Sequence, residues 1–494
     1  MSPAPNRPDS RRRWKALVVI SIAQLMVMLD SAVMNIALPS AQQALHLSDG
    51  NRQWVITAYG LAFGGLLLVG GRIGDMVGRK RVFLLALLGF ALASALGGAA
   101  TNASMLLTAR ALQGAFAALL APAALSLISL AFTEARERAK AFGIFSAVAV
   151  AGGAVGLLLG GLLTEYLSWR WAMFVNIPIA VAGVLGALPT VHDAGERHRS
   201  RLDMPGVVLA SLGLVAVVFS FSNAEGHGWT APSTIGSAVA GIVLLVAFIL
   251  VQARVKAPLL PLRILTERNR AAAYLSVALA VVSMFGMFLL LSYYFQAVRG
   301  YSPVEAGLAF LPLAVAQALG ASQVAARLST RIAPRPIMVG GYLVTAVGVA
   351  MLALLAVDSS YLTIALAEII VGLGIGAAFM PAMSLSTHGV GTRDAGVASA
   401  MISSSQQVGG SIGTALLNTV ATSSAAGYLA SHLGGAQAQQ RALVHGYSVA
   451  YWLAAGFLVV SALVSAIAVN ASAPERAPSR NRTATQEAVP VPTA

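Results

Sequence analysis

The sequence of 494 residues has no cysteine and few charged side chains. Without cysteine, the chain can form no disulfide, thiolate nucleophile, cysteine-bound zinc site or iron–sulfur cluster. Charged residues make up 10% of the chain, whereas a soluble domain carries about 25%. Hydrophobic residues make up 57%, and the mean hydropathy is +0.77. These proportions predict an all-α, polytopic membrane protein.

Two further chemistries have no sequence signal. The phosphate-binding pattern Gly-x-x-x-x-Gly-Lys-Ser/Thr is absent, so no site for ATP is evident. The seven histidines all fall in expected loops or at helix ends, which argues against an intramembrane metal site or histidine proton relay: His46, His192, His198, His227, His388, His432 and His445. We therefore expect no cofactor and no bound metal.

Apolar runs of about 17–25 residues, long enough to cross a bilayer as helices, recur along the chain. Fourteen such spans are expected, near residues 15–38, 53–71, 82–101, 105–132, 140–163, 171–189, 206–222, 235–252, 273–296, 305–328, 337–356, 361–384, 397–421 and 449–469. The lipid bilayer is thus the first predicted partner.

The distribution of Lys and Arg indicates the orientation of these spans. With the N-terminus in the cytoplasm, all but five of the 32 basic residues fall in cytoplasmic segments; the exceptions are Arg52, Arg170, Arg299 and Arg441 in external loops and Arg110 inside a span. The positive-inside rule requires such an asymmetry. We expect a multi-pass protein of the inner (plasma) membrane with both termini cytoplasmic. The net charge of +14 flanks membrane spans, so no nucleic-acid partner is expected.

Polar stretches divide the spans into two six-helix bundles plus two inserted helices. The expected parts are a disordered cytoplasmic tail (1–13), an N-terminal six-helix bundle (14–190), a linker with the two inserted helices (191–270), a C-terminal six-helix bundle (271–470) and a second disordered cytoplasmic tail (471–494). We expect the chain to act as a monomer.

A weak internal repeat relates the two bundles. Pro122-Ala-Ala-Leu-Ser in the fourth span corresponds to Pro381-Ala-Met-Ser in the twelfth, and Gly-Gly-x-x-Gly follows in the next span of each half, at 152–156 and 409–413. Related halves with binding sites between them are a recurring plan of secondary transporters.

Three ionisable residues lie well inside the expected spans: Asp30, Arg110 and Glu368. A charge at the bilayer centre costs roughly 2.5–3.5 kcal/mol on insertion scales, so each must face protein or water. At about 1.5 Å per residue, they lie roughly 13, 9 and 10 Å from the outer ends of their helices. The similar depths predict a central polar site.

A neighbouring guanidinium favours the ionised carboxylate, whereas burial favours its protonated form. This balance would let Asp30 exchange a proton, with Arg110 tuning it and Glu368 as a further proton-coupling residue. The alternatives are a purely structural role for Asp30 or for its pair with Arg110, and an aqueous vestibule facing Glu368.

Other polar side chains within spans are candidates for a substrate cavity. Those expected to line it are Asn35, Gln113, Tyr293 and Gln296. Each such residue taken alone is more often a hydrogen-bonding contact between helices.

Several motifs carry a family resemblance. They are the loop Gly71-Arg-Ile-Gly-Asp75-Met-Val-Gly78-Arg79-Lys-Arg81, then Leu107-x-x-Arg110-x-x-Gln113-Gly114, Asp30-x-x-x-x-Asn35-x-x-Leu38-Pro39, Trp169-Arg170-Trp171 with Asn176-x-Pro178, and Gln296-x-x-x-Gly300-Tyr301-Ser302-Pro303-x-Glu305-Ala306-Gly307. On these residues the chain resembles the major facilitator superfamily, specifically its 14-helix drug:proton antiporters, over roughly residues 15–470.

The resemblance implies roles for particular residues. It implies proton coupling by Arg110, and a gate latch formed by Asp75 and Arg79, with Gly71 and Gly78 shaping the loop. The fifth-helix antiporter motif appears as Gly152-x-x-x-Gly156-Leu157-x-x-Gly160-Gly161. Leu157 replaces the motif's proline, so any kink there must come from the glycines.

These observations predict a proton-driven exporter of hydrophobic small molecules, cations among them, that works by alternating access. A proton-coupled importer stays open, because the fold does not set direction and Leu157 departs from the export motif. A polytopic membrane enzyme would need a catalytic cluster, and a sensor would more typically carry a folded soluble domain. We find neither in the sequence, so we do not expect an enzyme.

Overall fold

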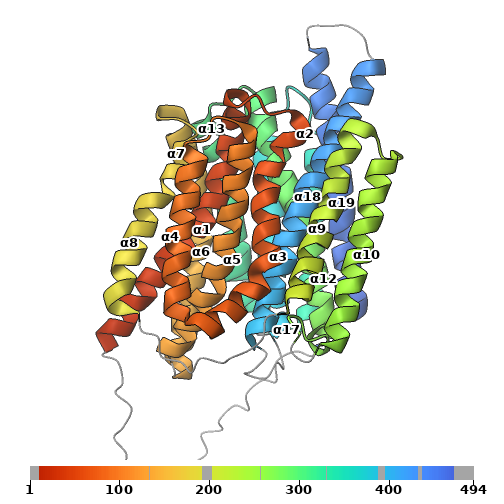
Figure 1. Cartoon of the computed structure of the whole chain (residues 1–494). Helices are drawn as coiled ribbons and strands as arrows, with labels where there is room; N and C mark the ends of the chain where they lie inside the picture. The colour runs from red at the N-terminus through yellow and green to blue at the C-terminus, as the bar shows by residue number, and fades with distance from the viewer. Residues whose placement is uncertain are drawn as a thin grey trace, which may run out of the picture.

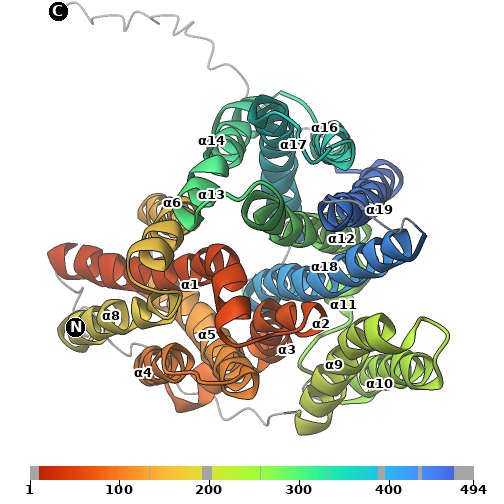
Figure 2. The ribbon, with the colours of Figure 1, turned by 90° about the horizontal axis from the view of Figure 1, so that it is seen from above.

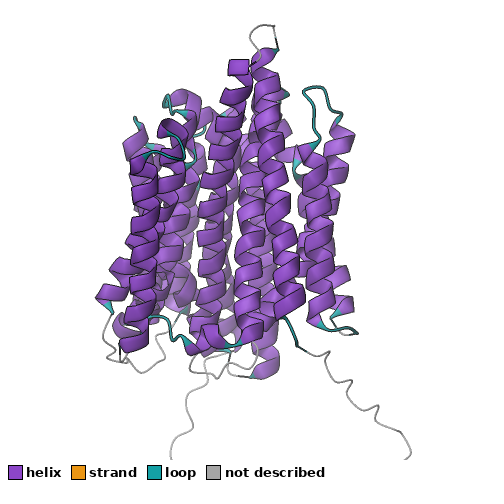
Figure 3. Ribbon diagram, turned by 90° about the vertical axis from the view of Figure 1, so that its right-hand side faces the viewer, coloured by secondary structure: helices purple, strands orange, loops and turns teal. Residues whose placement is uncertain are grey.

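The computed structural model describes residues 10–132, 134–191, 203–255, 258–329, 331–387, 395–431 and 437–471. All regular elements in these ranges are helices, and the long ones run side by side through one bundle (Figure 1, Figure 3). Most of the two predicted tails lies outside the described residues. We call the end of the bundle where α1 begins the terminal face, and the opposite end, where α1 finishes, the far face.

The helices follow the expected order along the chain. The first group comprises α1 (Ser10–Ala44), α2 (Asp49–Arg52), α3 (Trp54–Val77), α4 (Arg79–Gly98), α5 (Ala103–Ala131), α6 (Ala135–Tyr166), α7 (Trp171–Phe174) and α8 (Asn176–Thr190). The inserted pair is α9 (Met204–His227) and α10 (Pro232–Arg254). The last group comprises α11 (Arg263–Thr266), α12 (Arg268–Tyr293), the π-helix η1 (Tyr294–Val298), α13 (Pro303–Ala309), α14 (Leu311–Leu319), the π-helix η2 (Gly320–Ala325), α15 (Ala326–Leu328), α16 (Pro334–Ala353), α17 (Tyr361–Thr387), α18 (Ala395–Ser431) and α19 (Ala438–Ala468).

The helix lengths and hydropathies are those of a multi-pass membrane protein. Within the described residues, eleven segments are long and apolar enough to cross a membrane. Helices α3 and α6 contain shorter apolar stretches at Trp54–Leu67 and Val155–Tyr166, and α18 is 37 residues long. Counted with these three, the segments are consistent with the fourteen predicted spans.

The same packing pattern occurs in both groups of six long helices. In the first, α1 packs on α6 and α8, α5 on α3 and α4, and α4 on α8. In the second, α12 packs on α18 and α19, α17 on α14 and α16, and α16 on α19. The proline-bearing helices α5 and α17 thus occupy equivalent places, in line with the sequence repeat.

The most extensive contacts between the two halves are those of α3 with α18 and of α6 with α13. Glycines allow the second pair to approach closely. A Cβ at Gly161 would lie 2.6 Å from the carbonyl oxygen of Pro303, and one at Gly307 would lie 2.6 Å from that of Leu157. We call these two lines of contact the seams between the halves. Helix α9 packs on both α3 and α18, so the inserted pair lies beside the α3–α18 seam (Figure 2).

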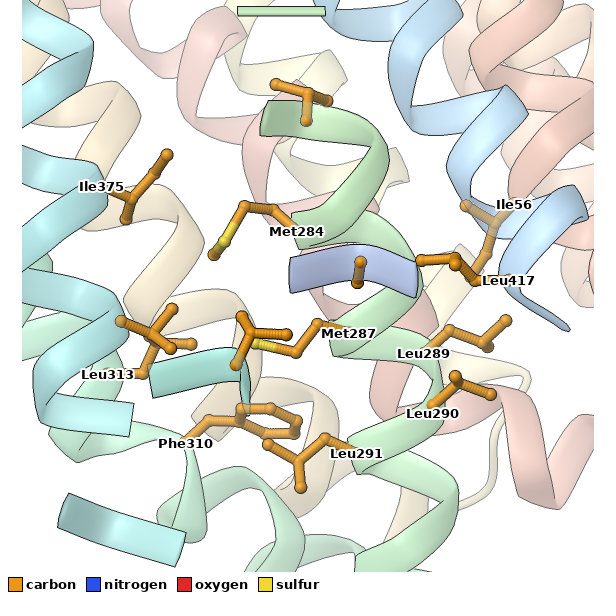
Figure 4. Close-up of a cluster of buried hydrophobic side chains, with 14 of the residues drawn as sticks. Ile56, Met284, Met287, Leu289, Leu290, Leu291, Phe310, Leu313, Ile375 and Leu417 are labelled. Atoms are coloured by element: carbon orange, nitrogen blue, oxygen red, sulfur yellow. The ribbon is translucent and has the colours of Figure 1, made fainter. Parts of the chain in front are cut away.

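One hydrophobic cluster extends across both halves. Around α12, it includes Ile56 and Leu417 on one side, and Leu313 and Ile375 on the other (Figure 4). A second cluster lies within the first half, where α1, α4 and α5 pack together. The apolar interior makes the few buried polar side chains conspicuous, because each needs a partner inside the protein.

Candidate functional site

A buried ion pair lies in the first half. A terminal nitrogen of Arg110 on α5 donates to Oδ2 of Asp30 on α1 at 2.7 Å, and the two side chains are 1% and 0% exposed. The Nε–H of Arg110 donates to the carbonyl oxygen of Val55 on α3 at 2.9 Å. Asp30 and Arg110 are therefore in direct contact, but the central polar site predicted from the similar depths does not include Glu368.

Gln113 connects the two charged groups. It lies three residues after Arg110, on the same face of α5. Its side-chain oxygen accepts from Arg110 at 2.9 Å, while its nitrogen donates to Oδ1 of Asp30 at 3.0 Å and to the hydroxyl of Ser94 on α4 at 2.8 Å. Gln113 was predicted to line a substrate cavity, and the structure places it inside the ion-pair network.

Two more side chains complete this network. Asn176, at the start of α8, donates to Oδ1 of Asp30 at 2.7 Å. The ring of Tyr59 on α3 lies 4.5 Å from the guanidinium of Arg110, and its buried hydroxyl has no hydrogen-bond partner among the described residues. We did not assign Asn176 or Tyr59 to the site from the sequence, although the Asn176-x-Pro178 motif was a signal for the first.

Hydrogen bonds in this network compensate the buried charge of Asp30. Three donors on the Asp30 carboxylate compensate for its loss of water, as a buried charge requires. These contacts join α1, α5 and α8 around one buried carboxylate.

Glu368 lies apart from this network, in the second half. It is seven residues into α17, just as Arg110 is seven residues into α5. It is 0% exposed, and neither carboxyl oxygen has a hydrogen-bond partner among the described residues. The polar groups with which it interacts electrostatically, Tyr451 and Tyr361, belong to the second half.

The other predicted cavity residues lie where α1 meets α12. Asn35 donates to the carbonyl oxygen of Ser31 in its own helix at 2.9 Å. Gln296 donates to the carbonyl oxygen of Ile36 at 3.2 Å, and the hydroxyl of Tyr293 donates to Gln42 at 2.5 Å. Tyr293 and Gln296 therefore join the two halves near the far face.

Arg52 is a functional candidate that the sequence analysis counted only as a loop charge. It is 3% exposed and donates from two nitrogens to the side-chain oxygen of Asn418 on α18, at 3.1 and 2.9 Å. Its guanidinium also lies 3.9 Å from the centre of the Tyr293 ring. We call Arg52, Asn418, Tyr293 and Gln42 the far-face latch, because they link the halves at that end.

The predicted gating loop lies between α3 and α4, at the terminal face. Gly78 has a φ of +110°, a conformation that only glycine adopts easily. A Cβ at Gly71 would lie 3.7 Å from Pro122, an ordinary contact. Arg79 begins α4, and the side chain of Asp75 is outside the described part of the chain. The gating role of these residues stays a prediction.

The predicted gating glycines of α6 face α1. A Cβ at Gly152 would lie 3.1 Å from Leu25 and Met28, one at Gly156 would lie 2.7 Å from Ala32, and one at Gly160 would lie 2.9 Å from Val33. These glycines let α6 pack tightly against the segment of α1 that carries Asp30. Their role in gating stays a prediction.

The described residues contain no cluster of three or more His, Asp or Glu side chains that could hold a metal ion.

The sequence profile of the Major Facilitator Superfamily matches residues 20–414. The chain belongs to the major facilitator superfamily. It is 51% identical over 472 residues to the puromycin resistance protein of Streptomyces alboniger, covering 95% of this chain and 93% of that protein. It is 39% identical over 430 residues to the cephamycin export protein of Amycolatopsis lactamdurans, covering 85% and 88% of the two.

Solved transporter structures share this architecture. A bacterial homologue of the human lysosomal transporter Spinster, in an inward-facing and unoccupied conformation, matches with a TM-score of 0.67 at 16% identity, over 93% of this chain and 97% of that one. A peptide transporter in complex with sulfate matches with a TM-score of 0.66 at 14% identity, over 91% and 93%. This superfamily member is thus a multi-pass membrane protein with a transporter fold.

Proposed function

We propose that this chain exports hydrophobic small molecules, cationic antibiotics among them, in exchange for protons. The observation that carries the proposal is the buried Asp30–Arg110 pair, because both charged groups cost free energy to place in a membrane and a carboxylate is a group that can carry a proton. The names of the relatives, a puromycin resistance protein and a cephamycin export protein, support the substrate class.

Alternating access gives the pair its role. The terminal face is cytoplasmic in this proposal, because the basic residues flank it. Hydrogen bonds between the halves support a state closed at the far face: Gln296 donates to Ile36, Arg52 to Asn418, and the backbone N–H of Val304 to Glu165 at 3.0 Å. A proton taken up by Asp30 when the far face opens would be released to the cytoplasm.

Substrate and proton need not share one site for exchange to occur. Protonation of Asp30 frees Arg110 from its counter-charge, and α1 carries both Asp30 and the residues that contact α12. Protonation of Asp30 can therefore alter the contacts between α1 and α12, which belong to different halves. Glu368 is proposed as a further proton-coupling residue, and Asn35, Tyr293 and Gln296 as residues that border the substrate path.

The test is the internal pH of proteoliposomes that hold the purified protein. Addition of puromycin or tetraphenylphosphonium should move protons opposite to the compound, and Asp30→Asn should abolish that movement. Glu305→Gln, which changes an exposed acid in a helix-capping turn, is the matched control and should behave as wild type. Movement in the same direction as the compound would indicate an importer instead, and unchanged exchange by Asp30→Asn would refute the role of this residue.

A further inference from the structure

The second half contains a buried acid without a partner. Glu368 is fully enclosed, makes no hydrogen bond and, among the described residues, forms no ion pair. An ionised carboxylate in such surroundings would cost several kcal/mol, far more than a neutral one. The environment therefore favours Glu368 as a neutral acid that carries its proton.

The contrast with Asp30 is sharp. Asp30 accepts hydrogen bonds from Arg110, Gln113 and Asn176, which is the surrounding of an ionised carboxylate. Glu368 has no donor at all among the described residues. The two buried acids thus lie in opposite surroundings, and they are on helices that are not equivalent in the repeat, because α17 corresponds to α5 and not to α1.

Tyrosines lie between Glu368 and the far face. Tyr451 on α19 is 1% exposed, and its hydroxyl has no hydrogen-bond partner among the described residues. It interacts electrostatically with both Glu368 and Tyr294. The hydroxyl of Tyr294, at the start of the π-helix η1, donates to the carbonyl oxygen of Ala356 at 2.7 Å.

Ala356 in turn borders a cavity at the far face. The cavity has a volume of about 470 Å³, and its polar lining includes Asp358 from the α16–α17 loop, with Arg441, His445 and Ser448 from α19. Val444 and Ser448 line it, and Tyr451 follows them on the same face of α19, because residues spaced by three or four are neighbours on a helix. Tyr451 is only about 4.5 Å further along the axis than Ser448.

We propose that Glu368 is a second proton site, separate from Asp30, which is loaded from this far-face cavity along the face of α19 that carries Tyr451. Neither the Tyr451 hydroxyl nor the Glu368 carboxyl has a hydrogen-bond partner among the described residues. In the loading step, a hydronium ion from the cavity gives its proton to the ionised Glu368 carboxylate, which leaves a water molecule and a neutral acid, and the Tyr451 hydroxyl lies on this route as a hydrogen-bonding group. The proton leaves Glu368 when the second half opens toward the terminal face. This inference rests on the proposed proton exchange and extends it to two protons for each molecule exported.

The first test needs no transport. A protonated buried carboxyl gives a C=O stretching band in the infrared spectrum, apart from those of the amides and ionised carboxylates. The purified protein at neutral pH should show this band, Glu368→Gln should lose it, and Asp30→Asn and Glu305→Gln should keep it. A band that persists in Glu368→Gln would overturn the proposal.

The second test counts protons in proteoliposomes with puromycin in its singly charged form or tetraphenylphosphonium. The wild type should move about two protons for each cation, and Glu368→Gln about one, because one intramembrane acid has been neutralised. Exchange by the variant should consequently stop responding to the membrane potential while still responding to a pH gradient. An unchanged proton count in Glu368→Gln would overturn the proposal.

The tyrosine path has its own matched pair of variants. Tyr451→Phe should slow proton-coupled exchange severalfold without changing the proton count. Tyr342→Phe removes another buried hydroxyl of the second half, near Ser276, and should leave the rate unchanged. Equal slowing in both variants would contradict the path. A wild type that moves no protons with either cation would instead refute the proposed exchange, and the infrared band would still report the state of Glu368.

Discussion

Arg52 and Asn418 join the two halves of the protein through a pair of hydrogen bonds to one oxygen, although 366 positions separate them in the chain. Arg52 ends the short helix α2, and Asn418 lies in the far-face part of α18. The ring of Tyr293 covers the guanidinium from α12. A buried arginine held in this way stabilises the arrangement in which the far face is closed.

We therefore expect Arg52→Met to open the far face. A buried hydrogen bond to a charged group contributes about 1.5–3 kcal/mol, so the equilibrium should shift toward the open state by about tenfold or more. Because the chain has no native cysteine, a single cysteine at Asn35 can report this shift through its reaction with a membrane-impermeant thiol reagent.

Arg299→Gln is the control for that experiment. Arg299 also lies at the far face, but it donates to the carbonyl oxygens of Val357 and Ser359 within its own half. Its loss should leave the labelling rate of the Asn35 cysteine unchanged. If Arg52→Met labels no faster than Arg299→Gln, the far-face latch does not hold the halves together.

Helix lengths and polar spacing predicted a large part of the fold and of the first site. Asp30 and Arg110 lie at similar depths in their helices, which allows them to meet. Gln113 can join them because it lies three residues after Arg110, on the same face of α5. Depth along a helix says nothing about the direction in which a side chain points, and so Glu368 was grouped with a site in the other half. In the structure its described polar neighbours, Tyr451 and Tyr361, come from the second half.

The sequence did not predict that Arg52 is buried, and the reason differs from that for Glu368. In the sequence it is one of four basic residues in loops on the same side. Its enclosure depends on α2 turning inward against α18 and on the position of Tyr293, which are contacts between distant segments. Hydrophobic periodicity carries no information about such contacts.

Asn176 should hold the Asp30 carboxylate in place. Asn176→Leu removes a 2.7 Å hydrogen bond to a buried charged group, and such a bond contributes about 1.5–3 kcal/mol. We expect this variant to melt at a lower temperature than the wild type and to exchange protons more slowly. Asn176→Asp should lose more of both, because it places a second carboxylate beside Asp30. Melting temperatures and rates that match the wild type would show that Asn176 does not support Asp30.

Gly161 should be less tolerant of a methyl group than Gly153 in the same helix. A Cβ at Gly161 would press on the Pro303 backbone across the seam, whereas nothing lies within 4 Å of one at Gly153. We expect Gly161→Ala to separate α6 from α13 and raise labelling of the Asn35 cysteine. Gly153→Ala should leave labelling unchanged and slightly raise the melting temperature, since alanine favours helix by about 0.5–1 kcal/mol. Equal labelling in the two variants would rule out a seam role for Gly161.

The stability of the ion pair should depend on which partner is removed. Breaking a buried pair costs about 3–5 kcal/mol when a charge is left uncompensated. Asp30→Asn leaves the buried guanidinium of Arg110 without a counter-charge, and a guanidinium cannot lose its proton. Arg110→Met leaves the buried carboxylate of Asp30, which can become neutral by binding a proton. In detergent, we expect both single variants to melt below the wild type, and Asp30→Asn to melt below Arg110→Met. The double variant should melt above Asp30→Asn, because no stranded charge remains. Strictly additive losses in the double variant would mean that the two groups do not stabilise each other.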